Sequence, residues 1–103
     1  MTDVRLDNAH ALPAQVASGE RSLAQVAQAV RAAADAAREL NVFVDPDLPG
    51  LEDRAAACLS GPLHGLPIVA KDIFDTLDQP TSGGTRALLG RRTASDAPIV
   101  ATL

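Results

Sequence analysis

A run of small apolar residues that recur every three or four positions constrains the fold of this chain more than any other feature. Over residues 23–40 the apolar positions fall on one helical face, and charged residues lie on the opposite face. Ser22 precedes the run and Gln25 follows three residues later, in the form of a capping box. The pattern predicts an amphipathic helix over residues 22–40 that packs on a core. Its predicted inward face comprises Leu23, Val26, Ala27, Val30, Ala33, Ala34, Ala37 and Leu40.

Shorter helices are predicted on both sides of this one. Pro13 suits the first turn of a helix that runs to about Ser18 and is ended by Gly19. Residues 51–59 can form another helix, with Leu51, Ala55, Cys58 and Leu59 directed inward.

A last helix is predicted near the end of the sequence. Ser95-Asp96 looks like an N-cap, and Pro98 is tolerated in the first turn that follows. This helix has barely two turns before Leu103, which suggests a truncated reading frame or a deliberate fragment.

The composition limits how large a core the chain can build. Its 103 residues allow at most one small domain, and alanine supplies much of the 47% hydrophobic content. With two phenylalanines and no tryptophan or tyrosine, each buried side chain removes little apolar area from water. We therefore expect marginal independent stability and a chain that is part of something larger.

Charge and cysteine content exclude several classes of function. A net charge of -4 argues against a nucleic-acid-binding surface, which needs a basic patch. The single Cys58 excludes an internal disulfide, and His10 and His64 have no metal-ligand spacing, so no metal is expected. No segment resembles a signal peptide or a membrane span, which predicts a cytoplasmic protein without membrane contact.

One lysine, Lys71, lies in an apolar segment of strand character. Residues 66–74 are too short for a helix and are bounded by turn formers, so they predict a short buried strand. A buried ammonium must be paired, hydrogen-bonded or neutralised. Either Lys71 reaches solvent and pairs loosely with Asp72 or Asp75, or it is held neutral to accept a proton. The pattern alone does not choose between these interpretations.

A glycine pair follows the lysine segment, within Thr81-Ser82-Gly83-Gly84-Thr85. Paired glycines let a backbone approach a ligand closely, and the neighbouring hydroxyls can serve a polar site. Taken alone, the pattern is more typical of a tight turn, and it lacks the lysine spacing of a phosphate-binding loop.

The sequence Gly-Pro-Leu-His-Gly-Leu-Pro-Ile-Val-Ala-Lys-Asp at residues 61–72 resembles the opening of the amidase signature family. The resemblance continues through Phe74-Asp75 and residues 80–85 and 95–97, and Asn41-Val42-Phe43-Val44 is similar to the family's Asn-Ala-Phe. It implies an α/β fold with a mixed sheet covered by helices. Residues 1–60 would form a mainly helical arm, and residues 61–103 would hold the first strands of a truncated catalytic core.

The resemblance also implies hydrolysis of a carboxylic amide by a Ser-Ser-Lys triad, without metal or organic cofactor. Lys71 matches the catalytic lysine, which acts through a bridging serine in a cis peptide bond on a second serine that attacks the amide carbon. In the family both serines and the segment that forms the oxyanion hole lie beyond the position of Leu103. Ser82 is therefore not assigned as a nucleophile, and the 103 residues alone are expected to be inactive.

The interpretation is thus an N-terminal portion of an amidase that supplies Lys71 and scaffold for a small-molecule amide substrate. The remainder of the amidase chain or a complementing subunit would complete the site, and a second copy of the chain is a further candidate partner. Within the family, the alternative is the A subunit of a glutamine-dependent tRNA amidotransferase. From another class, the alternative is a non-catalytic remnant or interaction module whose helix over residues 22–40 docks on a partner.

Overall fold

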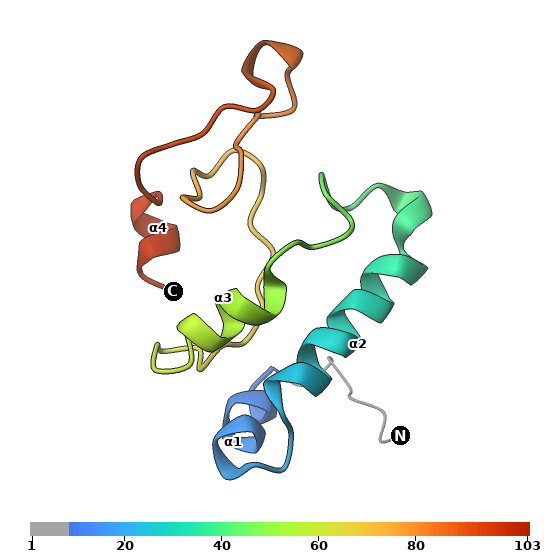
Figure 1. Ribbon diagram of the computed structural model, residues 1–103, viewed down its shortest axis with the longest axis vertical. Helices are drawn as coiled ribbons and strands as arrows, with labels where there is room; N and C mark the ends of the chain where they lie inside the picture. Colours follow the sequence, from blue (N-terminus) through green and yellow to red (C-terminus); the bar gives the residue numbers. More distant parts are fainter. Residues whose placement is uncertain (1–8) are drawn as a thin grey trace. The chain divides into compact units, whose positions relative to one another are not determined.

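Helices account for all the regular secondary structure of residues 9–103, the part of the chain that the computed structural model describes. These residues divide into two compact units, the first extending to Pro67 and the second running from Ile68 to Leu103. The first unit contains α1 (Ala11–Ser18), α2 (Leu23–Ala36), the 3-10 turn η1 (Arg38–Leu40) and α3 (Leu51–Ala57) (Figure 1). The second unit contains the 3-10 turn η2 (Arg86–Leu88) and the short helix α4 (Pro98–Ala101).

The ends of α1 and α2 follow the signals in the sequence. Gly19 ends α1 in the left-handed conformation, with φ of 79°, and its N–H donates to the carbonyl of Val16 at 3.2 Å. At the start of α2, Ser22 Oγ accepts the N–H of Gln25 at 3.1 Å, and Gln25 Oε1 accepts the N–H of Ser22 at 2.9 Å. The predicted capping box is therefore confirmed.

The end of α2 departs from the prediction. The α-helix stops at Ala36, η1 continues with a tighter winding, and Asn41 closes it in the left-handed region with φ of 50°. Because a 3-10 turn rotates successive side chains differently from an α-helix, Leu40 leaves the inward face and is 75% exposed. The inward positions predicted for Leu40 and Ala33 are wrong.

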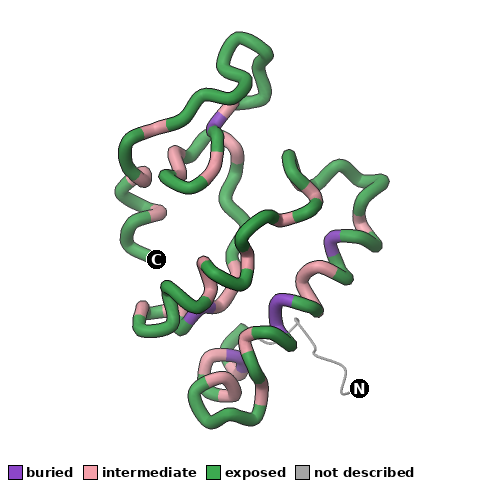
Figure 2. The backbone as a smooth tube through the Cα atoms, in the orientation of Figure 1, coloured by how far each residue is buried: buried purple, intermediate pink, exposed green. Residues whose placement is uncertain are grey.

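The first unit has a small apolar core, and Figure 2 marks its buried positions along α1 and α2. Its buried side chains are Leu12 from α1 and Val26, Ala27 and Ala34 from α2. The three residues from α2 are among those that the periodic pattern placed inward, because side chains three and four positions apart share one helical face.

One arginine ties the loop after η1 and the helix α3 to α2. Arg31 donates from Nε and Nη2 to the two carboxylate oxygens of Glu52, at 2.8 and 2.7 Å. It also donates to the carbonyls of Asp47 and Leu48, the latter at 3.1 Å. A planar guanidinium suits this arrangement because its donors form a rigid fork.

The helix α3 is shorter than expected. Cys58 caps its C-terminus and is exposed, and Leu59 is 47% exposed, so their predicted inward orientation is wrong. The chain turns back at this point, with the N–H of Gly61 donating to the carbonyl of Cys58 at 2.9 Å. This turn brings Gly65 so close to α3 that an added Cβ would lie 2.7 Å from the carbonyl oxygen of Ala55.

Residues 66–74 form no strand in this structure. Ile68, Val69 and Ile73 are 49%, 70% and 58% exposed, although the pattern predicted a buried strand. A strand needs a neighbour that accepts and donates its backbone hydrogen bonds, and residues 9–103 provide none. The first core strands and the α/β class expected from the sequence are therefore not confirmed.

The predicted cap of the last helix is also replaced. Ala97 is the N-cap of α4 and makes no side-chain capping bond, although Pro98 does occupy the first turn. The carboxylate of Asp96 instead accepts the N–H of Leu77 at 2.7 Å. None of the helices described over residues 9–103 has the length and apolar character needed to cross a bilayer.

Candidate functional site

Lys71, the one candidate catalytic residue from the sequence, lies in an irregular segment of the second unit. Its side chain is exposed, as are the preceding Val69 and Ala70, so the predicted burial of this lysine is wrong for residues 9–103. No hydrogen bond or ion pair joins its ammonium to any other residue of this part of the chain. Within the described part of the chain Lys71 is therefore an unpaired amine, next to loops whose acids are already hydrogen-bonded.

The residue after Lys71 is held firmly. Asp72 Oδ1 accepts the N–H of Ser82 at 3.0 Å, and the Ser82 hydroxyl donates to Asp72 Oδ2. The carbonyl of Asp72 also accepts the N–H of Gly83 at 2.8 Å. We call this arrangement of Asp72 with Ser82, Gly83 and Gly84 the Asp72 clasp.

The clasp changes the acidity of the carboxyl group. The hydroxyl of Ser82 contributes most to a lowered pKa of Asp72, followed by the backbone N–H of Ser82. The N–H groups of Gly84 and Gly83 act in the same direction, whereas desolvation by burial opposes them. Asp72 is thus stabilised as an anion by dipoles rather than by a cation.

Asp75, the second acid near the lysine in sequence, is bonded to other residues. Asp75 Oδ1 accepts from Arg91 Nη1 at 2.9 Å, and its carbonyl accepts the N–H of Ala97 at 2.8 Å. Of the interpretation in which Lys71 reaches solvent and pairs loosely with Asp72 or Asp75, the exposure is therefore observed and the pairing is not. Both acids hold loops of the second unit in place, and neither pairs with the lysine.

The loop over residues 81–85 closes on its own chain. Gly83 and Gly84 adopt φ of 61° and 75°, a region that side chains disfavour, and this lets their N–H groups face Asp72. Thr81 is the buried polar residue of the loop, and its N–H donates to the carbonyl of Arg91 at 2.9 Å. The sequence predicted a turn or a ligand loop here, and the structure shows a turn that binds an internal carboxylate.

The link between Asp72 and Ser82 was missed by the reasoning from sequence. The two residues are ten positions apart, and no periodic pattern or motif spacing connects them. The available signal was an acid next to a candidate catalytic lysine, followed by a serine immediately before a glycine pair. Such a loop presents several N–H donors to one anion.

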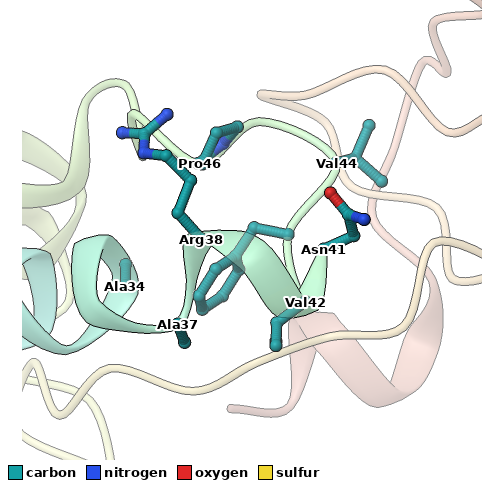
Figure 3. Close-up of a pocket in the computed structure, with 8 residues that line it drawn as sticks. Ala34, Ala37, Arg38, Asn41, Val42, Val44 and Pro46 are labelled. Atoms are coloured by element: carbon teal, nitrogen blue, oxygen red, sulfur yellow. The ribbon is translucent and has the colours of Figure 1, made fainter.

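A hollow of about 150 Å³ lies in the first unit, at the end of α2 (Figure 3). Its lining residues are Ala34, Ala37, Arg38, Asn41, Val42, Phe43, Val44 and Pro46. Ligand pockets generally measure about 300–1,000 Å³. The Arg38 guanidinium already pairs with Asp35 at 2.8 Å and with Asp47 at 3.2 Å, so the hollow offers no uncommitted charged group. Within residues 9–103 no three side chains are grouped as metal ligands either.

Comparison with known proteins gives one family and a set of relatives. The sequence profile of the family described as Amidase matches residues 24–103. Three relatives each carry the name of the A subunit of glutamyl-tRNA(Gln) amidotransferase. That of Paraburkholderia phytofirmans is 38% identical over 99 residues, which cover 89% of this chain and 20% of the relative. That of Salinispora arenicola is 37% identical over 115 residues, which cover 100% of this chain and 23% of the relative.

The third relative, from Bordetella pertussis, is 39% identical over 100 residues, which cover 90% of this chain and 20% of the relative. The chain therefore spans about a fifth of the length of the curated relatives it matches. No solved structure matches it.

Proposed function

Because this chain belongs to the amidase family, we propose that it supplies the lysine-bearing segment of a cytoplasmic enzyme that hydrolyses a carboxylic amide. In this proposal residues 1–60 are a mainly helical arm, of which residues 1–8 lie outside the described part of the chain, and residues 61–103 are the start of the catalytic core. In the complete enzyme the fold is α/β, with residues 66–74 as a strand in a mixed sheet covered by helices. Pairing of this strand covers Ile68, Val69 and Ile73, which are exposed among residues 9–103.

The observation that carries this proposal is the freedom of Lys71 in a segment densely supplied with acids. A carboxylate partner favours the charged form of a lysine and so makes it a poorer base. Asp72 and Asp75 are the acids next to Lys71 in sequence, and Ser82 and Arg91 engage them instead. An unpaired amine can lose its proton once apolar segments remove it from water.

In the proposed reaction Lys71 is the base of a Ser-Ser-Lys triad. Its neutral amine accepts a proton from a bridging serine, which takes one from a second serine as that hydroxyl oxygen attacks the amide carbon. Backbone N–H groups stabilise the oxyanion, the C–N bond breaks, and the leaving amine takes up the proton. Water then hydrolyses the acyl-enzyme. The two serines come from segments outside the 103 residues, so these residues alone hydrolyse no amide.

The test is replacement of Lys71 in the full-length enzyme. Lys71→Ala is expected to lower kcat on simple amides by about 10³-fold or more, because the base is removed. Lys71→Arg should do nearly as much damage, since a guanidinium does not give up its proton near neutral pH. Arg86→Ala removes an exposed cation of the same unit and serves as the matched control. Wild-type turnover in either Lys71 variant would return this residue to a surface role.

A second candidate function is favoured by the names of the relatives. Three relatives that are 37–39% identical are each named as the A subunit of glutamyl-tRNA(Gln) amidotransferase. By this analogy the amide would be that of glutamine, and the ammonia released would pass to a partner subunit. Glutamine hydrolysis that requires a co-purifying subunit would support this candidate. Hydrolysis of varied amides by the protein alone would support the first.

A non-catalytic role is the remaining alternative, in which α2 docks on a partner protein. Full-length protein that is monomeric, inert on amides and glutamine, and unaffected by Lys71→Ala would favour it.

A further inference from the structure

The Asp72 clasp joins the residue next to Lys71 to a loop ten positions further along the chain. Three of its contacts act on Asp72 at once, two on the carboxylate and one on the main-chain carbonyl. Contacts to both the side chain and the backbone of one residue fix its orientation more firmly than a side-chain contact alone. The peptide bond between Lys71 and Asp72 is therefore anchored from its C-terminal side.

The clasp also determines where the proton of Ser82 is directed. Ionised Asp72 can only accept hydrogen bonds, so the hydroxyl of Ser82 is the donor. A carboxylate with a lowered pKa is a poor base, so this pair does not generate a serine nucleophile. Its effect is to satisfy the Asp72 charge without Lys71.

We propose that Asp72 and Ser82 are positioning residues for Lys71, which anchor the lysine backbone and keep the adjacent carboxylate from pairing with the catalytic amine. This inference rests on the proposed function. Ser82 acts through Asp72, and neither side chain is required to touch the substrate. The glycine pair at Gly83 and Gly84 belongs to the same device, because its N–H groups support the negative charge.

Most of the other charged groups of the second unit already have hydrogen-bond or ion-pair partners. Asp75 and Arg91 pair with each other, and Asp96 accepts the N–H of Leu77. Arg92 donates to the carbonyl of Asp78 at 3.2 Å, Asp78 makes a further contact of its own, and Arg86 lies exposed in η2. Asp72 is thus the acid beside Lys71 that loss of one hydroxyl would leave with an unpaired carboxylate oxygen.

The experiment compares clasp variants of the full-length enzyme by the pH dependence of kcat/KM on a simple amide. Ser82→Ala removes the hydroxyl donor and leaves Asp72 Oδ2 without its partner. The exposed negative charge then favours the charged lysine, so the acid limb of the profile should move to higher pH. Its kcat should fall by about 10- to 100-fold while KM changes little, because the base is misplaced. Asp72→Asn should lower kcat without an upward shift of the acid limb, since no charge is released.

Two further variants separate positioning from general stability. Ser82→Thr retains the hydroxyl and should restore most of kcat and the wild-type acid limb. Ser95→Ala removes an exposed hydroxyl of the same unit and should leave kcat, KM and the pH profile unchanged.

A second readout does not depend on turnover. Competitive acylation with an amine-reactive reagent, followed by mass spectrometry of the peptide that contains Lys71, gives the titration of this amine directly. Lys71 is the only lysine among the 103 residues, so the peptide is easily assigned. The acylation midpoint should rise in Ser82→Ala and should not rise in Asp72→Asn.

The outcomes separate the positioning role from the proposed function. Wild-type kcat and an unchanged acylation midpoint in folded Ser82→Ala, with Lys71→Ala inactive, would overturn the positioning role alone. Full activity of Lys71→Ala would overturn the proposed function, whatever the clasp variants do. If Ser82→Ala does not fold, Asp72→Asn decides, because wild-type kcat in that variant also contradicts the proposal.

Discussion

Each of the two units of this chain is stabilised internally by a different kind of interaction. In the first unit, apolar side chains on α1 and α2 form the core, with Leu12 and Val26 only 4% and 2% exposed. In the second unit, Thr81 is the single buried residue, and side chains such as Asp72, Asp75 and Asp96 fix the loops by hydrogen bonds. Hydrophobic burial stabilises the first unit, and polar contacts give the second its shape.

The difference separates segments that form from local signals from segments that need a pairing partner. An amphipathic helix satisfies its own backbone and requires only one apolar surface to pack on. An extended apolar segment such as residues 66–74 needs partner strands, and these commonly come from distant parts of a chain. The first unit has therefore formed its elements from local signals, whereas the second exposes the residues that a sheet would cover.

The largest effect is expected where the first unit is packed most tightly. Gly65→Ala should lower the free energy of unfolding by roughly 2 to 4 kcal/mol, because the new Cβ clashes and the residue is left-handed. The Cβ would lie 2.7 Å from the carbonyl oxygen of Ala55. Gly19→Ala is the matched control, with the same φ of 79° and no atom within 4 Å. Chemical denaturation gives the free energy of unfolding of both variants, and the difference between their losses is the cost of the clash. Equal losses of unfolding free energy would show that Gly65 is not tightly packed.

A smaller effect is expected at the start of α2. Ser22→Ala removes one half of the capping box and should cost about 1 kcal/mol, because the N–H of Gln25 loses its acceptor. Ser22→Thr retains the hydroxyl and should keep most of the stability. Ser60→Ala, which removes an exposed serine outside the helices, is the control. Thermal unfolding checks this, and an unchanged midpoint in Ser22→Ala would mean that tertiary packing alone fixes the start of α2.

The ion pair between Arg31 and Glu52 predicts that the stability of the first unit depends on pH. The hydrogen bond from Arg31, helped by a backbone hydrogen bond and opposed by desolvation, lowers the pKa of Glu52 from 4.5 to about 2. A depressed folded-state pKa means that the stabilisation is complete above pH 4.5 and is lost as the pH falls toward 2. Because the pair is half exposed, the effect should be small and reduced by salt.

The measurement is the unfolding midpoint of the wild type and Glu52→Gln across this pH range. Glu52→Gln should flatten the dependence, whereas Asp53→Asn, which replaces an exposed acid on the same helical turn, should leave it in place. A wild-type midpoint that does not change between pH 4.5 and 2 would contradict the role of Arg31.

The smallest effect is expected in the second unit, from a substitution that compares the two units directly. In the 103-residue chain Val69→Thr should change the free energy of unfolding by less than about 0.5 kcal/mol, because Val69 is 70% exposed. Val26→Thr makes the same chemical change at a buried site and should cost roughly 1 to 3 kcal/mol. Equal costs, measured by denaturant unfolding, would remove the distinction between the two units.

Sequence reasoning succeeded where a few neighbouring residues decide the outcome. Gly19 ends α1 and the capping box starts α2 as predicted, because both signals act within four residues. It failed for Leu40 and Cys58, whose orientation depends on how each helix ends. The strand over residues 66–74 was not formed because its propensity has no pairing partner among residues 9–103.

For the candidate site, the motif around Lys71 indicated the family and the residue of interest. It did not show that Asp72 binds Ser82 or that Asp75 binds Arg91, since these pairs are ten and sixteen residues apart. The predicted loose pairing of Lys71 required a free Asp72 or Asp75, and both acids are bonded to other residues.

The sequence by itself determined the start of α2, the turn at the glycine pair and membership of the amidase family. Only the tertiary structure decided which acids of the second unit are hydrogen-bonded elsewhere and that Lys71 has no partner among residues 9–103. The physical reason is that capping and turn signals operate over a few residues. The partner of a charged side chain is set by the path of the folded chain, which brings distant donors and acceptors together.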